Sequence, residues 1–201
     1  MAAGAPGWLA SAWTVSLLAA GLAARGRLRW PAPLLAAGLS AATTAFFRDP
    51  EREPAEGAVL AAADGVVKVV ERRPDGRVRI ATYMSLRDVH VNRAPTDAAV
   101  RALEHRPGGY RPAFRKDSEH NERLVWTLDT PLGELELVQI AGVLGRRIVP
   151  YRRPGERVSR GERIGLIRFG SRVDLVLPVG IEPAVSVRDR VRAGRTRLDR
   201  A

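Results

Sequence analysis

Two short segments of the sequence carry side chains suited to acid–base or nucleophilic chemistry. Asp88, His90 and Asn92 alternate along one segment, so on an extended strand they would share one face. A carboxylate, an imidazole and an amide in one row would orient the histidine for proton transfer, although a buried histidine with satisfied hydrogen bonds has the same pattern. In the second segment, Gly170-Ser171, a glycine that tolerates a strained turn precedes a hydroxyl nucleophile, and an ordinary β-turn fits equally well.

Other polar positions are weaker candidates when each is taken alone. Asp64-Gly65 precedes a run of valines and reads first as a common turn with an acidic residue. The pair Arg146-Arg147 is suited to bidentate binding of a phosphate or carboxylate, although solvated surface is the ordinary fate of an arginine pair. The three histidines, at positions 90, 105 and 120, lack the spacing and the cysteine partners of a metal site. We therefore expect no metal.

The composition excludes several kinds of chemistry and favours anionic partners. The sequence has no cysteine, which excludes disulfides, cysteine-ligated metals and thiol catalysis. Lys68 and Lys116 are its only lysines, so a Schiff-base lysine has two candidates. With 33 Lys+Arg against 22 Asp+Glu, the net charge of +11 favours nucleic acid, acidic small molecules or an anionic membrane. Only 5% of the residues are aromatic and no nucleic-acid motif is recognisable, which argues against nucleic acid.

The elements that must position these residues follow a change of composition at Arg48, where Asp49-Pro50 marks a linker. Beyond it, short runs rich in valine, isoleucine and leucine alternate with turns, and Pro74-Asp75-Gly76 joins two of them as a hairpin. No long amphipathic helix is recognisable there. We predict a mainly β domain over residues 48–201, a β-sandwich or barrel. Its expected strands are Val66–Glu71, Val78–Met84, Leu124–Leu128, Leu135–Ile140, Arg163–Phe169 and Arg172–Leu177.

Residues 1–47 form a separate hydrophobic region with no acidic residue. Residues 5–24 and 30–47 are uncharged and approach the ~20 residues with which a helix crosses a bilayer. This pattern predicts a helical hairpin in or on a membrane, with a cleavable signal peptide and a buried soluble hairpin as the alternatives. The turn Arg25–Arg29 is basic, so the positive-inside rule places it in the cytoplasm and two full crossings would place residues 48–201 outside. A re-entrant or interfacial hairpin avoids that conflict.

A series of motifs, taken in order and spacing, resembles the short, bacterial and archaeal type of phosphatidylserine decarboxylase. The resemblance runs from about residue 46 to the C-terminus. Its motifs are Phe46-Phe-Arg-Asp-Pro-Glu51, Ala62-Ala-Asp-Gly65, Asp88-Val-His-Val-Asn-Arg-Ala-Pro95, Asn121-Glu-Arg123, Gln139-Ile-Ala-Gly142, Arg146-Arg-Ile148 and Phe169-Gly-Ser-Arg-Val-Asp174.

This resemblance implies a proenzyme that makes its own cofactor. In such a family, Ser171 would attack the carbonyl of Gly170, the chain would split into a β chain of residues 1–170 and an α chain of residues 171–201, and Ser171 would become a covalent pyruvoyl group (pyruvate). The amine of phosphatidylserine would form a Schiff base with it, and loss of CO2 would give phosphatidylethanolamine. His90 and Asp64 would serve the Ser171 hydroxyl as a proton relay. The long-type enzymes carry a second histidine where this sequence has Arg93, so the division of tasks is open.

The resemblance also implies where the protein works. We expect Arg146, Arg147 and Arg172 to bind the lipid head group, and the αβ heterodimer to lie on the anionic cell membrane, peripheral or anchored by the hairpin, with its catalytic domain in the cytoplasm. Nucleic acid is not an expected partner. The alternative is a non-catalytic, membrane-tethered β-barrel that binds lipid and leaves Gly170-Ser171 uncut.

Overall fold

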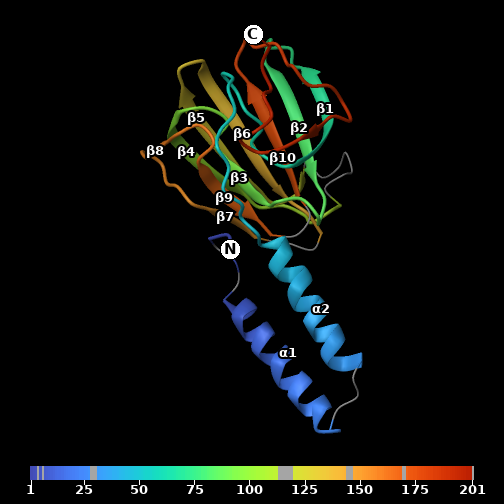
Figure 1. Cartoon of the computed structure of the whole chain (residues 1–201). Helices are drawn as coiled ribbons and strands as arrows, with labels where there is room; N and C mark the ends of the chain where they lie inside the picture. Colours follow the sequence, from blue (N-terminus) through green and yellow to red (C-terminus); the bar gives the residue numbers. More distant parts are fainter. Residues whose placement is uncertain are drawn as a thin grey trace. The chain divides into compact units, whose positions relative to one another are not determined.

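A computed structural model describes the chain at residues 1–3, 5, 7–27, 31–112, 120–143, 147–168 and 171–200. The chain divides into two compact units, Met1–Asp49 and Pro50–Ala201. Figure 1 traces both units in the colours of the sequence. The first unit is helical and the second is built from strands, so the described part of the chain is mainly β and contains two helices.

The helical unit consists of α1 (Trp8–Ala24) and α2 (Pro31–Phe46). Trp13 Nε1 donates a hydrogen bond to Thr44 Oγ1 at 2.8 Å, and the hydroxyls of Ser16 and Ser40 lie 3.1 Å apart. These contacts join the two helices along one side of each. Other positions expose large apolar side chains: Val15, Leu17, Leu18, Leu22, Leu34, Leu35 and Leu39.

The two helices are shorter than the uncharged stretches that contain them, with 17 residues in α1 and 16 in α2. Within the described residues, neither helix combines the length and the apolar character that a membrane crossing requires. Residues 28–30, which include the expected turn residue Arg29, lie outside the described part. The helical hairpin and its membrane association therefore stay predictions.

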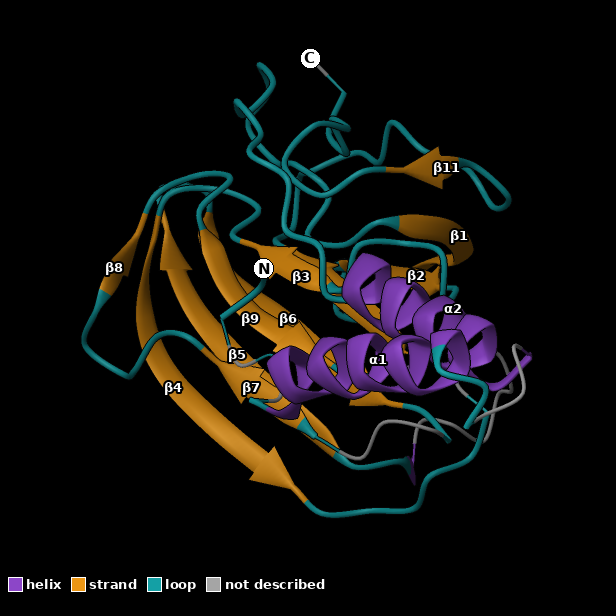
Figure 2. Cartoon of the chain, turned by 60° about the horizontal axis from the view of Figure 1, so that its bottom comes forward, coloured by secondary structure: helices purple, strands orange, loops and turns teal. Residues whose placement is uncertain are grey.

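The strand unit contains a large, open sheet in which every neighbouring pair of strands is antiparallel. Its order is β11-β1-β2-β10-β6-β5-β4-β8, so β10, which begins at Ser171, lies between β2 and β6. Figure 2 shows that β4 is strongly bent along its length. The strands are β1 (Gly65–Arg72), β2 (Val78–Met84), β4 (Ala98–Arg106), β5 (Arg123–Thr130), β6 (Gly133–Ala141), β8 (Arg157–Val158), β10 (Ser171–Leu177) and β11 (Arg190–Val191).

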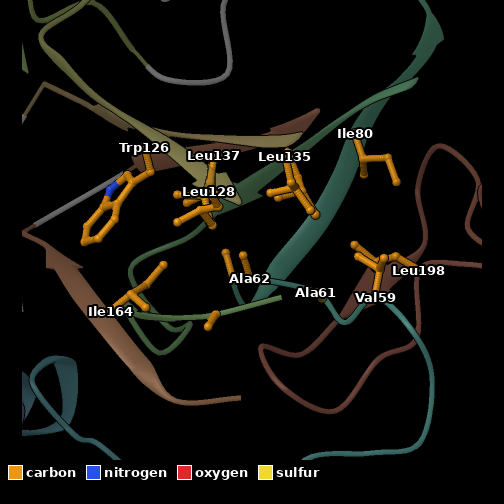
Figure 3. Close-up of a cluster of buried hydrophobic side chains, with 14 of the residues drawn as sticks. Val59, Ala61, Ala62, Ile80, Trp126, Leu128, Leu135, Leu137, Ile164 and Leu198 are labelled. Atoms are coloured by element: carbon orange, nitrogen blue, oxygen red, sulfur yellow. The ribbon is translucent and has the colours of Figure 1, made fainter. Parts of the chain in front are cut away.

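A smaller sheet has the order β3 (Val91–Arg93), β9 (Arg163–Ile167) and β7 (Ile148–Pro150). The two sheets enclose one hydrophobic core, because residues of both belong to the same buried cluster. Figure 3 shows Trp126, Leu128, Leu135 and Leu137 of the large sheet on one side and Ile164 of β9 on the other. Burial of such side chains from water is the main source of stability for a fold of this kind.

The mainly β prediction is confirmed, and its details are refined. The expected hairpin is formed by β1 and β2, which pair through Arg72 and Val78, with Gly76 at φ 82° in the turn. The expected strands at 124–128, 135–140, 163–169 and 172–177 correspond to β5, β6, β9 and β10. Among the described strands both sheets are open, so the sandwich description fits better than a closed barrel. β4 was not anticipated from the sequence.

Candidate active site

Ser171 is the first residue of β10 and is fully buried. Its backbone pairs with Met84 of β2 on one side and with Ala141 of β6 on the other. Successive side chains of a strand point to opposite faces. Ser171 shares its face with the core residues Val173 and Leu175, so its hydroxyl points toward the interior between the sheets.

The Ser171 hydroxyl contacts a sulfur atom and, through it, a series of buried side chains. Ser171 Oγ donates to Met84 Sδ at 3.4 Å, and Asn92 Nδ2 donates to the same sulfur at 3.8 Å. Asn92 Oδ1 in turn accepts from Gln139 Nε2 at 2.7 Å, and Gln139 Oε1 accepts from Trp126 Nε1 at 2.8 Å. All five residues are completely or almost completely buried. The serine therefore stands at one end of a polar series inside an apolar core.

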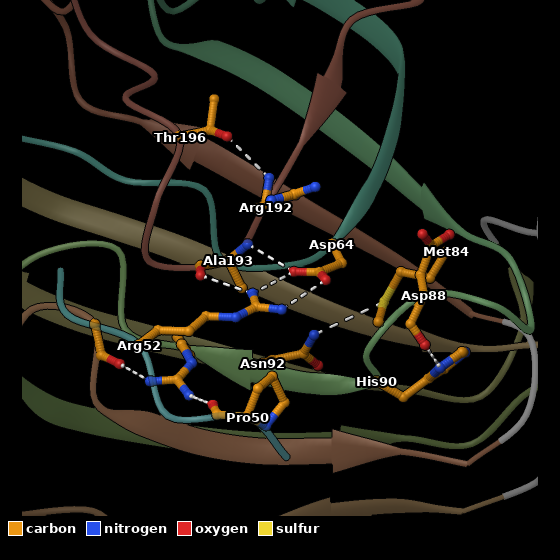
Figure 4. Close-up of polar contacts among 12 residues, drawn as sticks. Pro50, Arg52, Asp64, Met84, Asp88, His90, Asn92, Arg192, Ala193 and Thr196 are labelled. Carbon is orange, nitrogen blue, oxygen red and sulfur yellow. Dashed lines mark hydrogen bonds and ion pairs between the residues drawn. The ribbon is translucent and has the colours of Figure 1, made fainter. Parts of the chain in front are cut away.

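His90 is also fully buried, but its neighbourhood differs from the predicted row of side chains. Asp88 lies in a turn and β3 begins only at Val91, so the alternating strand does not extend back to Asp88 and His90. The Asp88 carboxylate accepts from the backbone N and the hydroxyl of Ser85, at 2.8 and 2.7 Å, and from Arg190 Nη2 at 3.0 Å. His90 Nδ1 instead lies 3.0 Å from the Asp88 carbonyl oxygen, as Figure 4 shows.

Asp64 immediately precedes β1, and its buried carboxylate has a basic partner. Arg52 binds it with two hydrogen bonds, Nη1 to Oδ1 at 2.6 Å and Nη2 to Oδ2 at 2.8 Å. The backbone N of Ala193 donates to Oδ1 at 2.8 Å, and Arg52 Nη1 also donates to the Ala193 carbonyl at 3.0 Å. Figure 4 shows the carboxylate directed toward Arg52 and Ala193. These contacts attach the segment around residue 193 to the start of β1.

The arginines singled out for the head group occupy different environments. Arg172 lies on the face of β10 opposite Ser171 and binds Asp174 with two hydrogen bonds of 2.5 Å, from Nε and Nη2. The sheet therefore separates its guanidinium from the Ser171 hydroxyl. Arg79 Nε lies 3.0 Å from the same Asp174 carboxylate, which makes this outer-face cluster ionic. Arg146 and the cleavage residue Gly170 lie outside the described residues.

Arg147 lies opposite a second arginine. Ile148 of β7 pairs with Ile167 of β9, and the next residue on each side is an arginine. The Arg168 backbone N donates a hydrogen bond to the Arg147 carbonyl at 3.1 Å. Burial lowers the pKa of the Arg168 guanidinium, and the positive charge of Arg147 lowers it further. Two like charges at opposed positions of a strand pair repel one another, and an anion between them would relieve this repulsion.

From the sequence, Gln139 was noted only as part of a motif, and Met84, Trp126 and Arg168 were given no role. A signal for Gln139 was present, because it follows Leu135 and Leu137 on the apolar face of an alternating strand. A polar residue at such a position has to find a buried partner. As for metals, the described residues contain no group of three or more His, Asp or Glu side chains that could hold an ion.

Comparison with known proteins gives consistent matches. Residues 39–199 match the family described as Phosphatidylserine decarboxylase. A protein of Thermobifida fusca named phosphatidylserine decarboxylase proenzyme is 56% identical over all of this chain and 92% of its own length. A protein of the same name from Streptomyces avermitilis is 49% identical, over 100% of this chain and 93% of its own. One from Halobacterium salinarum, named putative archaetidylserine decarboxylase proenzyme, is 47% identical over 77% of this chain and 79% of its own.

Proposed function

The chain belongs to the phosphatidylserine decarboxylase family of enzymes, and from this premise we propose that it cuts itself at Gly170-Ser171 and converts phosphatidylserine to phosphatidylethanolamine. One observation carries the proposal. The Ser171 hydroxyl is completely buried, at the first residue of a central strand and directed to the interior. A purely structural position of this kind would favour an apolar side chain, because burying a hydroxyl gains little stability.

The first proposed step uses the chain's own atoms. Ser171 Oγ loses its proton to a base and bonds to the carbonyl carbon of residue 170, and the peptide C–N bond breaks to leave an ester and a free amine at residue 171. Removal of the Ser171 Cα proton then expels the carboxylate of residue 170 and leaves dehydroalanine. Its enamine tautomerises to an imine, and water replaces the nitrogen, which leaves as ammonia. The products are residues 1–170 and a pyruvoyl-capped chain of residues 171–201.

We assign the base in this step to His90. Its hydrogen bond to the Asp88 carbonyl favours the neutral tautomer with the proton on Nδ1, because a carbonyl oxygen accepts only. In that tautomer Nε2 is the basic nitrogen. We assign Asp64 a supporting role, in which its carboxylate, bound by Arg52 and Ala193, holds the segment after the cut in place.

The residues present fit a pyruvoyl group, because the group would arise from Ser171 itself, at a buried position in contact with Met84 Sδ, the sulfur to which the Asn92 amide also donates. When formed, the group would supply an electron sink for the electron pair released as CO2 departs. The chain's contribution is to enclose this carbonyl and exclude bulk water from it. The apolar residues around Ser171 serve that purpose.

The substrate and its setting are proposed from charge and surface. Arg168 lies shortly before the proposed cut, and Arg147 lies opposite it across the pairing of β7 with β9. This like-charged pair is suited to the phosphate or carboxylate of the lipid head group. The exposed leucines of α1 and α2 are suited to contact a lipid surface, and the net charge of +11 favours an anionic one. We therefore propose a peripheral membrane location.

The proposal is tested by the intact mass of the purified protein, with a carbonyl-reactive probe added to a second sample. We expect a C-terminal fragment of residues 171–201 that begins with pyruvoyl and takes up the probe. The same sample should release CO2 from vesicles that contain phosphatidylserine. An uncut chain in detergent and in vesicles would reject the proposal and favour the non-catalytic lipid-binding module.

A second substrate has specific support, because four relatives at 44–47% identity are named putative archaetidylserine decarboxylase proenzymes. Vesicles that carry the ether lipid archaetidylserine, compared with vesicles that carry the diacyl lipid, separate the two substrates by their initial rates. The self-cleavage step is the same for both.

A further inference from the structure

A continuous series of hydrogen bonds crosses the space between the two sheets and ends at Ser171. Trp126 Nε1 donates to Gln139 Oε1 at 2.8 Å, and Gln139 Nε2 donates to Asn92 Oδ1 at 2.7 Å. Asn92 Nδ2 then donates to Met84 Sδ at 3.8 Å, the atom to which Ser171 Oγ donates at 3.4 Å. Trp126, Gln139, Asn92, Met84 and Ser171 are each fully buried.

The direction of this series is fixed at its far end. An indole N–H donates and never accepts, so Gln139 must present its oxygen to Trp126 and its NH2 group to Asn92. Asn92 must then present its oxygen to Gln139 and its NH2 group to Met84. Trp126 therefore decides, for the side-chain amides of both Gln139 and Asn92, which way the oxygen and which way the nitrogen points.

The fold is built around this series. Asn92 belongs to β3 of the small sheet, whereas Met84, Trp126, Gln139 and Ser171 come from β2, β5, β6 and β10 of the large sheet. The amides thus hold the two sheets in one register next to the serine. Gly165 of β9 leaves room for the Gln139 amide, since a Cβ atom at this position would lie 3.0 Å from Nε2.

We propose that Gln139, Asn92 and Met84 are positioning residues that hold the Ser171 hydroxyl for its attack on the preceding carbonyl; the inference rests on the proposed self-cleavage. A thioether sulfur is a weak acceptor, so this contact keeps the hydroxyl oxygen in place without binding its hydrogen strongly, and the hydrogen can turn to the base. The Asn92 N–H holds the sulfur from another direction. A displacement of a reacting atom by ~1 Å can slow a reaction about 100-fold, so the position of this sulfur matters for the rate.

The test follows self-cleavage of freshly synthesised full-length chains by mass, with thermal unfolding measured on the same proteins. Met84→Leu nearly conserves volume and removes the acceptor. Gln139→Glu keeps the shape and the acceptor for Trp126 but, when ionised, cannot donate to Asn92. We expect each variant to cut at least about tenfold more slowly than wild type at pH 8. Lowering the pH should restore the Gln139→Glu rate relative to wild type, because a protonated glutamate donates again.

Leu137→Met is the matched control, because it makes the reverse exchange in the same core and on the same strand as Gln139. It should cut at the wild-type rate. The positioning role is refuted if wild type cuts and both Met84→Leu and Gln139→Glu cut at the wild-type rate. It is also refuted if these two variants and the control Leu137→Met slow equally. A wild-type chain that stays uncut refutes the proposed function instead. Where Gln139→Glu fails to fold, Met84→Leu alone decides between these outcomes.

Discussion

At the scale of single residues, the Ser171 hydroxyl contributes little to folding and everything to the proposed cleavage. Its donated hydrogen bond goes to a sulfur, a weak acceptor, so Ser171→Ala should change the free energy of unfolding by no more than about 1 kcal/mol. The variant should remain one chain of residues 1–201, take up no carbonyl probe and be inactive. Urea unfolding and intact mass measure the two effects. Fragments cut after residue 170 in this variant would show that another group starts the cleavage.

His90 allows a sharper substitution than alanine. The Nδ2 atom of asparagine can occupy the place of histidine Nδ1 and donate to the Asp88 carbonyl, but asparagine has no basic nitrogen. We expect His90→Asn to fold and to cut roughly 100-fold or more slowly, in the range usual for loss of a general base. His90→Ala should be at least as slow. A time course of cleavage at pH 7 checks this, and wild-type rates in both variants would exclude His90 from the step.

The sequence drew attention to Asp88, His90 and Asn92 but did not predict their contacts. Asp88, His90 and Asn92 are all buried, but only Asn92 lies on the strand. Alternation fails before Val91 because the Asp88 carboxylate binds Ser85 N and Oγ and so closes a turn. The group that His90 Nδ1 contacts is a backbone carbonyl, which every residue carries and which no pattern of side chains can indicate.

At the scale of elements, the approach of β9 to β6 depends on the missing side chain of Gly165. A Cβ atom there would lie 2.9 Å from the Val149 carbonyl and 3.0 Å from Gln139 Nε2, closer than such atoms normally come. Gly165→Ala should therefore cost about 1–3 kcal/mol of the free energy of unfolding and slow cleavage by displacing the amide. Chemical denaturation and cleavage time courses measure both effects.

Gly109→Ala is the control for this change, because among the described residues its Cβ atom would meet only Asn121 Oδ1, at an ordinary 3.9 Å. This variant should keep the wild-type cleavage rate. Equal losses in the two glycine variants would contradict the argument from close packing at β9.

Elements were predictable where alternation is regular and were missed where it breaks. β6 alternates over most of its length, and the sequence located it to within a few residues. β4 contains a bulge between Val100 and Ala102, so the alternation between the two faces of the strand shifts by one residue after it. The pairing of β10 between β2 and β6 is also absent from any local pattern, because it joins segments about 90 and 35 residues apart.

At the scale of the whole strand unit, the proposed cut would not release the C-terminal chain. Residues 171–201 supply β10, which lies between β2 and β6, and β11, which pairs with β1. Backbone bonds also join Leu198 N to the Val59 carbonyl and Gly194 N to the Ala61 carbonyl, each at 2.8 Å. We expect the cleaved protein to elute as one species in size-exclusion chromatography and to separate only in denaturant. Separation in native buffer would contradict this placement of β10.

Acid should loosen this attachment through Asp199 near the C-terminus. Burial alone would raise its pKa, but hydrogen bonds from Arg197 and the Val59 backbone outweigh burial and lower the pKa below its ordinary 3.8. A carboxyl group with a lowered folded-state pKa stabilises the fold above the unfolded-state value, and this stabilisation is lost as the pH falls through the folded-state value. The free energy of unfolding should therefore decline as the pH drops below about 3.8.

Asp199→Asn isolates that contribution from those of the other acidic groups. Asn cannot ionise, so the variant should lose about 1–3 kcal/mol at pH 7, where wild type has the charge-assisted bonds to Val59 N and Arg197. The difference between the two proteins should then shrink as the pH falls from about 4 to 2. Asp75→Asn serves as the control, because Asp75 also has a lowered pKa but binds only its neighbour Arg77 in an exposed turn. Urea unfolding at each pH gives the free energy of unfolding of each protein. If the difference in this free energy between wild type and Asp199→Asn stays constant down to pH 2, the Asp199 carboxylate is not responsible for the loss of stability in acid.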